Sequence, residues 1–188
     1  LVGILDFQDG IVKADKPIFG GVSTRATGYD VTDGVDGDCN TMYLSDDMQV
    51  LNVDTDISYH NLEDALLTCS SPCNLKLIAN VNMYEPVTVL ANDELSINLN
   101  GKTLNMVEDS LITNRGHLTL TNGTLYMNSP IYDTSVATPN MIYNYGVLDL
   151  NNNVTINASD YLRIRTVYND HATVNLDHAT LIHNRAPD

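Results

Sequence analysis

An internal repeat constrains the fold of this chain more than any other feature of its sequence. Residues 112–127 align without a gap on residues 142–157. Both copies keep one pattern of Asn, Gly and two leucines, with Asn114, Gly116, Leu118 and Leu120 aligned on Asn144, Gly146, Leu148 and Leu150. A third copy spans residues 167–182, with one residue inserted after Asn169, and a more degenerate copy spans residues 95–106. A repeat of roughly 20–30 residues is typical of stacked, solenoid architectures.

Each copy contains two short segments in which apolar residues occupy every second position. That alternation predicts β-strands, and the intervening Asn and Gly residues predict turns, because both residue types tolerate unusual backbone angles. Strands this short suit one coil of a parallel β-solenoid per copy, with inward side chains stacked from coil to coil. We expect four leucines in related inward positions: Leu99, Leu120, Leu150 and Leu176.

The recurring asparagines predict a ladder between coils. Asn114, Asn144 and Asn169 occupy equivalent places in the three clearest copies. An Asn side chain can bond to its equivalent in the next coil and to nearby backbone. The alternative interpretation is that Asn and Gly only mark ordinary loops.

Two segments precede the repeats. A short amphipathic helix is predicted where Leu62, Ala65 and Leu66 recur at helical spacing behind a capping residue, Ser58 or Asn61. It would cover the open apolar end of the first coil. Upstream of this helix, the chain is rich in Gly, Asp and Thr, and its apolar residues are scattered.

These differences divide the chain into an N-terminal arm, residues 1–55, and a solenoid domain, residues 56–188. The arm has too little regular apolar pattern to bury a core of its own, so we expect it to become ordered against another surface. The apolar residues that such a surface would cover are Ile4, Leu5, Ile18 and Phe19. The arm is therefore the predicted attachment or oligomerisation segment.

The charge of the chain excludes some classes of partner. Nine Lys and Arg residues stand against 24 Asp and Glu residues, a formal net charge of −15. That field repels nucleic acid and anionic membrane surfaces. No apolar run approaches the roughly 20 residues that span a bilayer, so we expect a soluble chain without membrane insertion.

The cysteines leave their redox state open. Cys69 and Cys73 are close enough in sequence to form a small disulfide in an oxidising compartment, while Cys39 is the odd third thiol. Free, partly buried thiols are the favoured interpretation, and a Cys69–Cys73 bridge is the alternative.

The short helix is followed by residues 75–81, residues 87–89 and residues 95–104, and the last of these segments ends in Asn-Gly-Lys-Thr-Leu. This arrangement resembles the pectate-lyase-like right-handed parallel β-helix superfamily. The resemblance covers roughly residues 57–183. It is nearest to the non-catalytic members found in bacterial surface proteins and in bacteriophage fibres or spikes. It implies an all-β, right-handed parallel β-helix with a short N-terminal capping helix and an extended N-terminal arm.

The resemblance also implies a function and a location. The expected protein is a non-enzymatic structural or adhesive solenoid exposed on a virion or cell surface, foremost a fibre, spike or decoration protein of a bacteriophage particle. It would be a homotrimer, held through its arm by a capsid, tail or cell-surface anchor, with glycans as potential ligands. A bacterial adhesin repeat module and a polysaccharide lyase or hydrolase are the alternatives, because the same coils carry all three functions.

Residues with catalytic or binding chemistry are sparse in the repeats. An enzyme on such coils needs clustered carboxylates, and the acids of the repeats are isolated. No catalytic residue or cofactor is therefore predicted. Arg163 and Arg165 are two residues apart on one predicted strand and are candidate binding residues, although a solvated strand face is the simpler interpretation.

One acidic cluster lies in the arm. Asp30, Asp33, Asp36 and Asp38 supply hard oxygen ligands beside flexible glycines, but their spacing differs from that of an EF-hand. A solvated acidic turn is the favoured interpretation, and a calcium site is the alternative.

Overall fold

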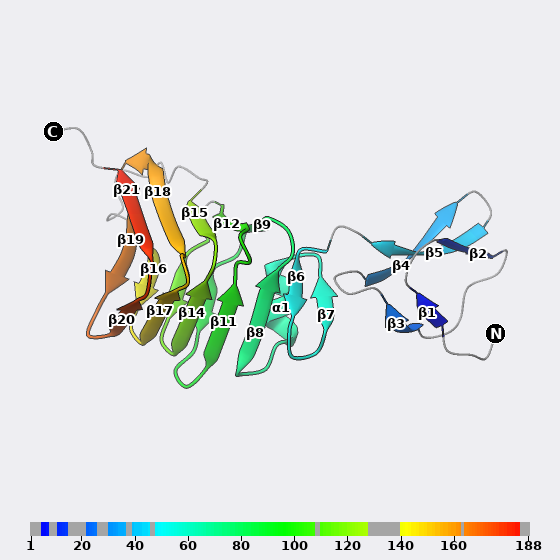
Figure 1. The fold of residues 1–188 in the computed structure, drawn as a ribbon, viewed down its shortest axis with the longest axis horizontal. Helices are drawn as coiled ribbons and strands as arrows, with labels where there is room; N and C mark the ends of the chain where they lie inside the picture. Colours follow the sequence, from blue (N-terminus) through cyan, green and yellow to red (C-terminus); the bar gives the residue numbers. More distant parts are fainter. Residues whose placement is uncertain are drawn as a thin grey trace.

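The computed structural model describes residues 48–107, 110–127, 140–162 and 164–184, together with five strands nearer the N-terminus. For these five strands, and for residues 159–162 and 183–184, the backbone alone is described. The N-terminal strands are β1 (Leu5–Phe7), β2 (Ile11–Ala14), β3 (Val22–Arg25), β4 (Asp30–Asp36) and β5 (Cys39–Ser45). Strands β1 and β3 pair in parallel, whereas β5 pairs with β2 and β4 in an antiparallel sheet. Figure 1 shows them in sheets separate from those of the stacked coils.

The remaining elements, in chain order, are β6 (Val50–Asn52), β7 (Ile57–Tyr59), α1 (Leu62–Thr68), β8 (Cys73–Leu77), β9 (Val81–Met83), β10 (Val87–Val89), β11 (Glu94–Asn98), β12 (Thr103–Met106), β13 (Ile112–Asn114), β14 (His117–Thr121), β15 (Thr124–Met127), β16 (Asn140–Asn144), β17 (Val147–Asn151), β18 (Thr155–Leu162), β19 (Arg165–Asn169), β20 (Thr173–Leu176) and β21 (Thr180–Asn184).

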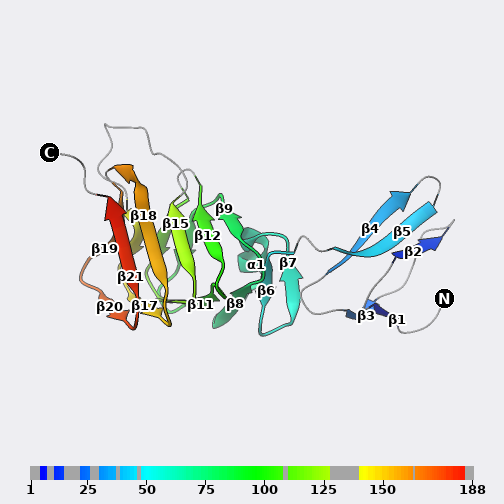
Figure 2. The same cartoon turned by 45° about the horizontal axis from the view of Figure 1, so that its top comes forward.

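From β8 onward these strands form a solenoid of about four turns, in which each turn adds one strand to each of three sheets. The first sheet has the order β20-β17-β14-β11-β8-β6-β7, the second β21-β18-β15-β12-β9 and the third β10-β13-β16-β19. Neighbouring coils pair in parallel, and Figure 2 shows their strands stacked side by side. The prediction of an all-β, parallel solenoid is confirmed.

Apolar residues at alternate strand positions fill the interior. In the first sheet, one inward row pairs from coil to coil and is fully buried, and it consists of Leu75, Ile97, Leu120 and Leu150. Leu99 was expected in this row, but the partner of Leu120 is Ile97. Leu99 is buried just beyond the end of β11, where its N–H donates to the Thr121 carbonyl. A slip of two residues keeps the same face of a strand inward, so alternation alone does not detect it.

Leu176 departs from the expected inward position. It pairs with the fully buried Leu150, yet 57% of its surface is exposed. Strand β20 is the last strand of its sheet, and within the described part of the chain no further coil lies beyond it. Burial of an equivalent side chain therefore depends on whether a following coil covers it.

The N-terminal end of the solenoid is formed by a hairpin and a helix. Strands β6 and β7 pair antiparallel, and β6 extends the first sheet beside β8. This sheet therefore begins at Val50, ahead of the boundary expected at residue 56. Helix α1 follows, and the Asn61 side chain accepts a hydrogen bond from the Asp64 N–H at 2.7 Å as an N-cap. The helix contacts β6, β7 and β9.

Two kinds of residue allow the coils to turn and stack closely. Asn100 and Asn122 adopt φ of 52° and 59° at corners, the left-handed region that Asn tolerates. Gly146 serves a different purpose, because a Cβ there would collide with the Gly116 carbonyl oxygen of the preceding coil.

No helix among the described residues is long and apolar enough to cross a membrane.

Candidate functional site

The three predicted ladder asparagines lie one above another at the start of a corner. The Asn114 Nδ2 donates to the Asn144 Oδ1 at 2.7 Å, and the Asn144 Nδ2 donates to the Asn169 Oδ1 at 2.7 Å. Each amide also reaches backbone, since the Asn114 Nδ2 donates to the Val147 carbonyl at 2.8 Å and the Asn144 Nδ2 donates to the Thr173 carbonyl at 2.9 Å.

Burial shows what this stack does. Asn114 and Asn144 are fully buried, whereas Asn169, in the last coil, is exposed. Buried amides are costly unless they are hydrogen-bonded, so the bonds between coils fix the register of the stack. Asn114 and Asn144 are therefore structural and are buried away from any external ligand.

A polar cluster lies on the outward face of the first sheet. The His117 Nε2 and the Asp149 Oδ2 are 2.7 Å apart, and the Asn175 Nδ2 donates to the Asp149 Oδ1 at 2.6 Å. Burial alone would raise the pKa of Asp149, but the hydrogen bonds from Asn175 and His117, together with the charge of His117, hold it below its usual value. The imidazole is oriented by a carboxylate that stays ionised at neutral pH.

An aromatic cluster lies at the third sheet and the corner that follows it. The ring centroids of Tyr143 and Tyr168 are 6.0 Å apart, and those of Tyr145 and Tyr168 are 6.5 Å apart in an edge-to-face arrangement. The Arg115 guanidinium carbon lies 5.2 Å from the centroid of the Tyr145 ring. Tyr145 and Tyr168 are each 39% exposed. We refer to these four residues as the tyrosine cluster.

A groove of about 410 Å³ lies between α1, the segment that follows it, β10 and the start of β11. Its apolar lining includes Leu66, Leu67, Val87 and Leu95, and four acidic side chains lie among its lining residues: Glu63, Glu85, Asp93 and Glu94. We refer to it as the α1–β10 groove. Its position beside a sheet edge distinguishes it from the flat outer faces of the coils.

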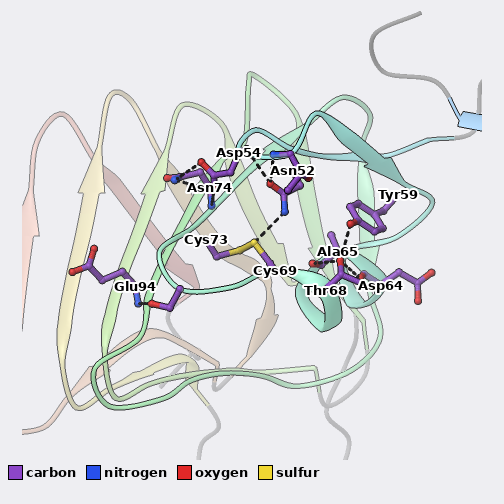
Figure 3. Close-up of a disulfide and its surroundings, with 12 residues drawn as sticks. Asn52, Asp54, Tyr59, Asp64, Ala65, Thr68, Cys69, Cys73, Asn74 and Glu94 are labelled. Atoms are coloured by element: carbon purple, nitrogen blue, oxygen red, sulfur yellow. Dashed lines mark hydrogen bonds between the residues drawn. A yellow bond between two sulfur atoms is a disulfide. The ribbon is translucent and has the colours of Figure 1, made fainter. Parts of the chain in front are cut away.

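A disulfide joins the two elements next to this groove. Cys69, directly after α1, is bonded to Cys73, the first residue of β8, with their Cα atoms 5.6 Å apart. Figure 3 shows the bridge beneath Asn52, whose Nδ2 donates to the Cys69 Sγ at 3.3 Å. The Glu94 N–H donates to the Ser71 Oγ at 2.9 Å, which ties the bridged segment to β11. The bridged alternative is thus the one found here, in place of the favoured free thiols.

Most of the other predicted site residues lie where the structure does not describe their side chains. Arg165 is exposed at the start of β19, and Arg163 lies outside the described residues. Asp38 lies outside them as well, and the side chains of Asp30, Asp33 and Asp36 in β4 are not described. Within the described part of the chain, no group of three or more His, Cys, Asp or Glu side chains is arranged to hold a metal ion.

Sequence reasoning missed the tyrosine cluster, although the repeat carries a signal for it. Tyr143 and Tyr168 both directly precede a ladder asparagine, in Ile-Tyr-Asn and Val-Tyr-Asn. Because the preceding apolar residue points inward, the tyrosine must point outward, and equivalent tyrosines of adjacent coils must meet. No such signal marks the α1–β10 groove, which forms between segments without a repeat.

The comparisons with known proteins add no relative. No protein-family model matches the chain, and no curated protein and no solved structure matches it either.

Proposed function

We propose that this chain is a non-enzymatic, adhesive β-solenoid, displayed on a surface, which contacts its target through the tyrosine cluster. The observation that carries the proposal is the exposure of Tyr145 and Tyr168, packed edge to face, beside Arg115. Tyrosine is favoured at binding surfaces because it offers a large, amphipathic contact area with few rotatable bonds. The ladder holds these rings in place, since Tyr143 and Tyr168 adjoin Asn144 and Asn169.

The chemistry of the cluster favours a glycan as the target. Flat aromatic faces stack on the apolar faces of sugar rings, and tyrosine hydroxyls and a guanidinium hydrogen-bond sugar hydroxyls or carboxylates. Arg115 also supplies a positive charge in a chain of net charge −15, which reduces the repulsion between the cluster and an acidic polysaccharide. We therefore place the contact at this cluster.

The assembly proposal is a bacteriophage fibre, spike or decoration protein. Its arm, residues 1–55, attaches to the particle, and three chains associate so that the solenoids project outward from a virion surface. The support is the family resemblance and the poor apolar pattern of the arm. A repeat module of a bacterial cell-surface adhesin is the alternative assembly with the same glycan contact.

Substitution of the exposed tyrosines tests the proposed contact. We expect Tyr145→Ala/Tyr168→Ala to weaken binding to a panel of acidic bacterial polysaccharides by about tenfold or more, because stacked aromatic contacts dominate such interfaces. The matched control is Tyr84→Ala, which removes a tyrosine that is 59% exposed after β9, outside the cluster. Binding is measured by microarray and confirmed by calorimetry.

Two results would contradict the proposal. Equal losses from the double variant and from Tyr84→Ala would show that the cluster is not the contact. Release of reducing or unsaturated sugars from any polysaccharide of the panel would favour the polysaccharide lyase or hydrolase alternative, and the His117–Asp149 pair would be the first group to substitute.

A further inference from the structure

The α1–β10 groove contains an open strand edge. Strand β10 is the terminal strand of the third sheet and pairs only with β13 among the described strands. Helix α1 and the disulfide-bridged segment come just before β8. In a regular coil, this part of the chain would instead supply a strand that lies beside β10. The groove thus occupies the place of a missing strand.

Backbone geometry shows which groups the edge presents. The Val87 N–H donates to the Leu111 carbonyl at 3.0 Å, and the Val89 carbonyl accepts from the Arg115 N–H at 2.8 Å. Both residues therefore direct their backbone groups towards β13. In an extended strand the next residue faces the opposite way, so the N–H and carbonyl of Thr88 point into the groove.

Apolar side chains surround this edge. Leu66 is half-buried against the core, and Leu67 is 84% exposed at the end of α1. Together with Leu66, Val87 and Leu95, it gives the groove a contiguous apolar lining that a partner can cover. The Cys69–Cys73 bridge and the Glu94–Ser71 hydrogen bond fix the segment between α1 and β8, so the groove is preformed.

The charge of the groove selects the partner. Four acidic residues line the groove, and its lining contains no Lys or Arg. Glu85 and Glu94 are exposed, whereas the Glu63 Oε1 already accepts from the Tyr84 N–H at 2.9 Å. A second copy of this chain, itself at −15, would add repulsion, so charge complementarity requires a basic partner.

We propose that the α1–β10 groove binds an extended, basic segment of a partner protein as an added strand beside β10. The segment hydrogen-bonds to the N–H and carbonyl of Thr88, packs alternate apolar side chains on Leu66 and Leu67, and directs Lys or Arg side chains to Glu85 and Glu94. Main-chain pairing gives affinity and the alternate side chains give specificity, as in other cases of strand addition. This site is separate from the tyrosine cluster.

Two backbone-methylated peptides test the pairing. The probe is fluorescein-labelled Lys-Val-Lys-Val-Lys-Val, bound to the full chain and followed by anisotropy. One derivative is N-methylated at every Lys and the other at every Val. Because alternate N–H groups of an added strand face the edge, one derivative loses about tenfold or more in affinity and the other binds like the parent. Equal binding of the two derivatives overturns strand addition.

Charge variants test the choice of partner. We expect Glu85→Gln/Glu94→Gln to weaken binding of the probe about tenfold and to reduce its salt dependence. The matched control, Asp170→Asn/Asp177→Asn, removes the same charge from exposed positions of the last coil and leaves binding unchanged. Equal effects of the two pairs, or equal binding of Glu-Val-Glu-Val-Glu-Val, overturn the proposal. We expect the Tyr145→Ala/Tyr168→Ala variant to bind the probe as the unsubstituted chain does. A failure of the strand-addition proposal can therefore be distinguished from a failure of the glycan contact.

Discussion

Asn144 occupies the middle of the asparagine stack, where it is fully buried and bonds to the coils on both sides. We expect Asn144→Ala to lower the free energy of unfolding by about 2–4 kcal/mol, because it leaves the amide groups of its neighbours short of partners and opens a small cavity. Asn169→Ala removes an exposed end of the same stack and is expected to cost about 1 kcal/mol or less. Urea unfolding measures both, and similar losses would show that the ladder contributes little.

At the scale of elements, strands β17 and β20 provide a matched pair. Leu150 and Leu176 are register partners on adjacent strands, but Leu150 is fully buried and Leu176 is 57% exposed. Leu150→Ala is expected to cost about 2–5 kcal/mol through lost burial and a residual cavity. Leu176→Ala is expected to stay within about 0.5 kcal/mol, as surface substitutions do. Melting temperatures and urea midpoints check this, and a large loss from Leu176→Ala would mean that another surface covers it in solution.

At the scale of the whole molecule, the prediction concerns association through the arm. Ordering a residue costs about 1–2 kcal/mol, and an arm with few regularly spaced apolar residues offsets that cost best against other chains. We expect light scattering of the full chain to give three times the chain mass of 20.6 kDa. A shortened chain beginning at Met48, a buried residue ahead of β6, is expected to be a monomer. A monomeric full chain would refute the arm as an assembly element.

The repeat predicted most of the solenoid, because a period of two within strands and a recurrence between coils are both local patterns. It also placed Asn114, Asn144 and Asn169 in one stack, since the copies align there without ambiguity. It misplaced Leu99, because the loop lengths of the coils differ and a slip of two residues leaves the inward face unchanged. The tyrosine cluster was predictable from the same alignment, through the recurrence of Tyr before Asn.

Sequence alone therefore determined that the chain forms stacked parallel strands, which side chains of each strand face inward, and where the coils turn. Tertiary structure decided which of these positions are covered, as the contrast between Leu150 and Leu176 shows. It also decided that Cys69 and Cys73 are joined and that α1 stands beside β10, leaving a strand edge open. The physical reason is that alternation is encoded within each strand, whereas burial and open edges depend on which segments, distant in sequence, lie alongside.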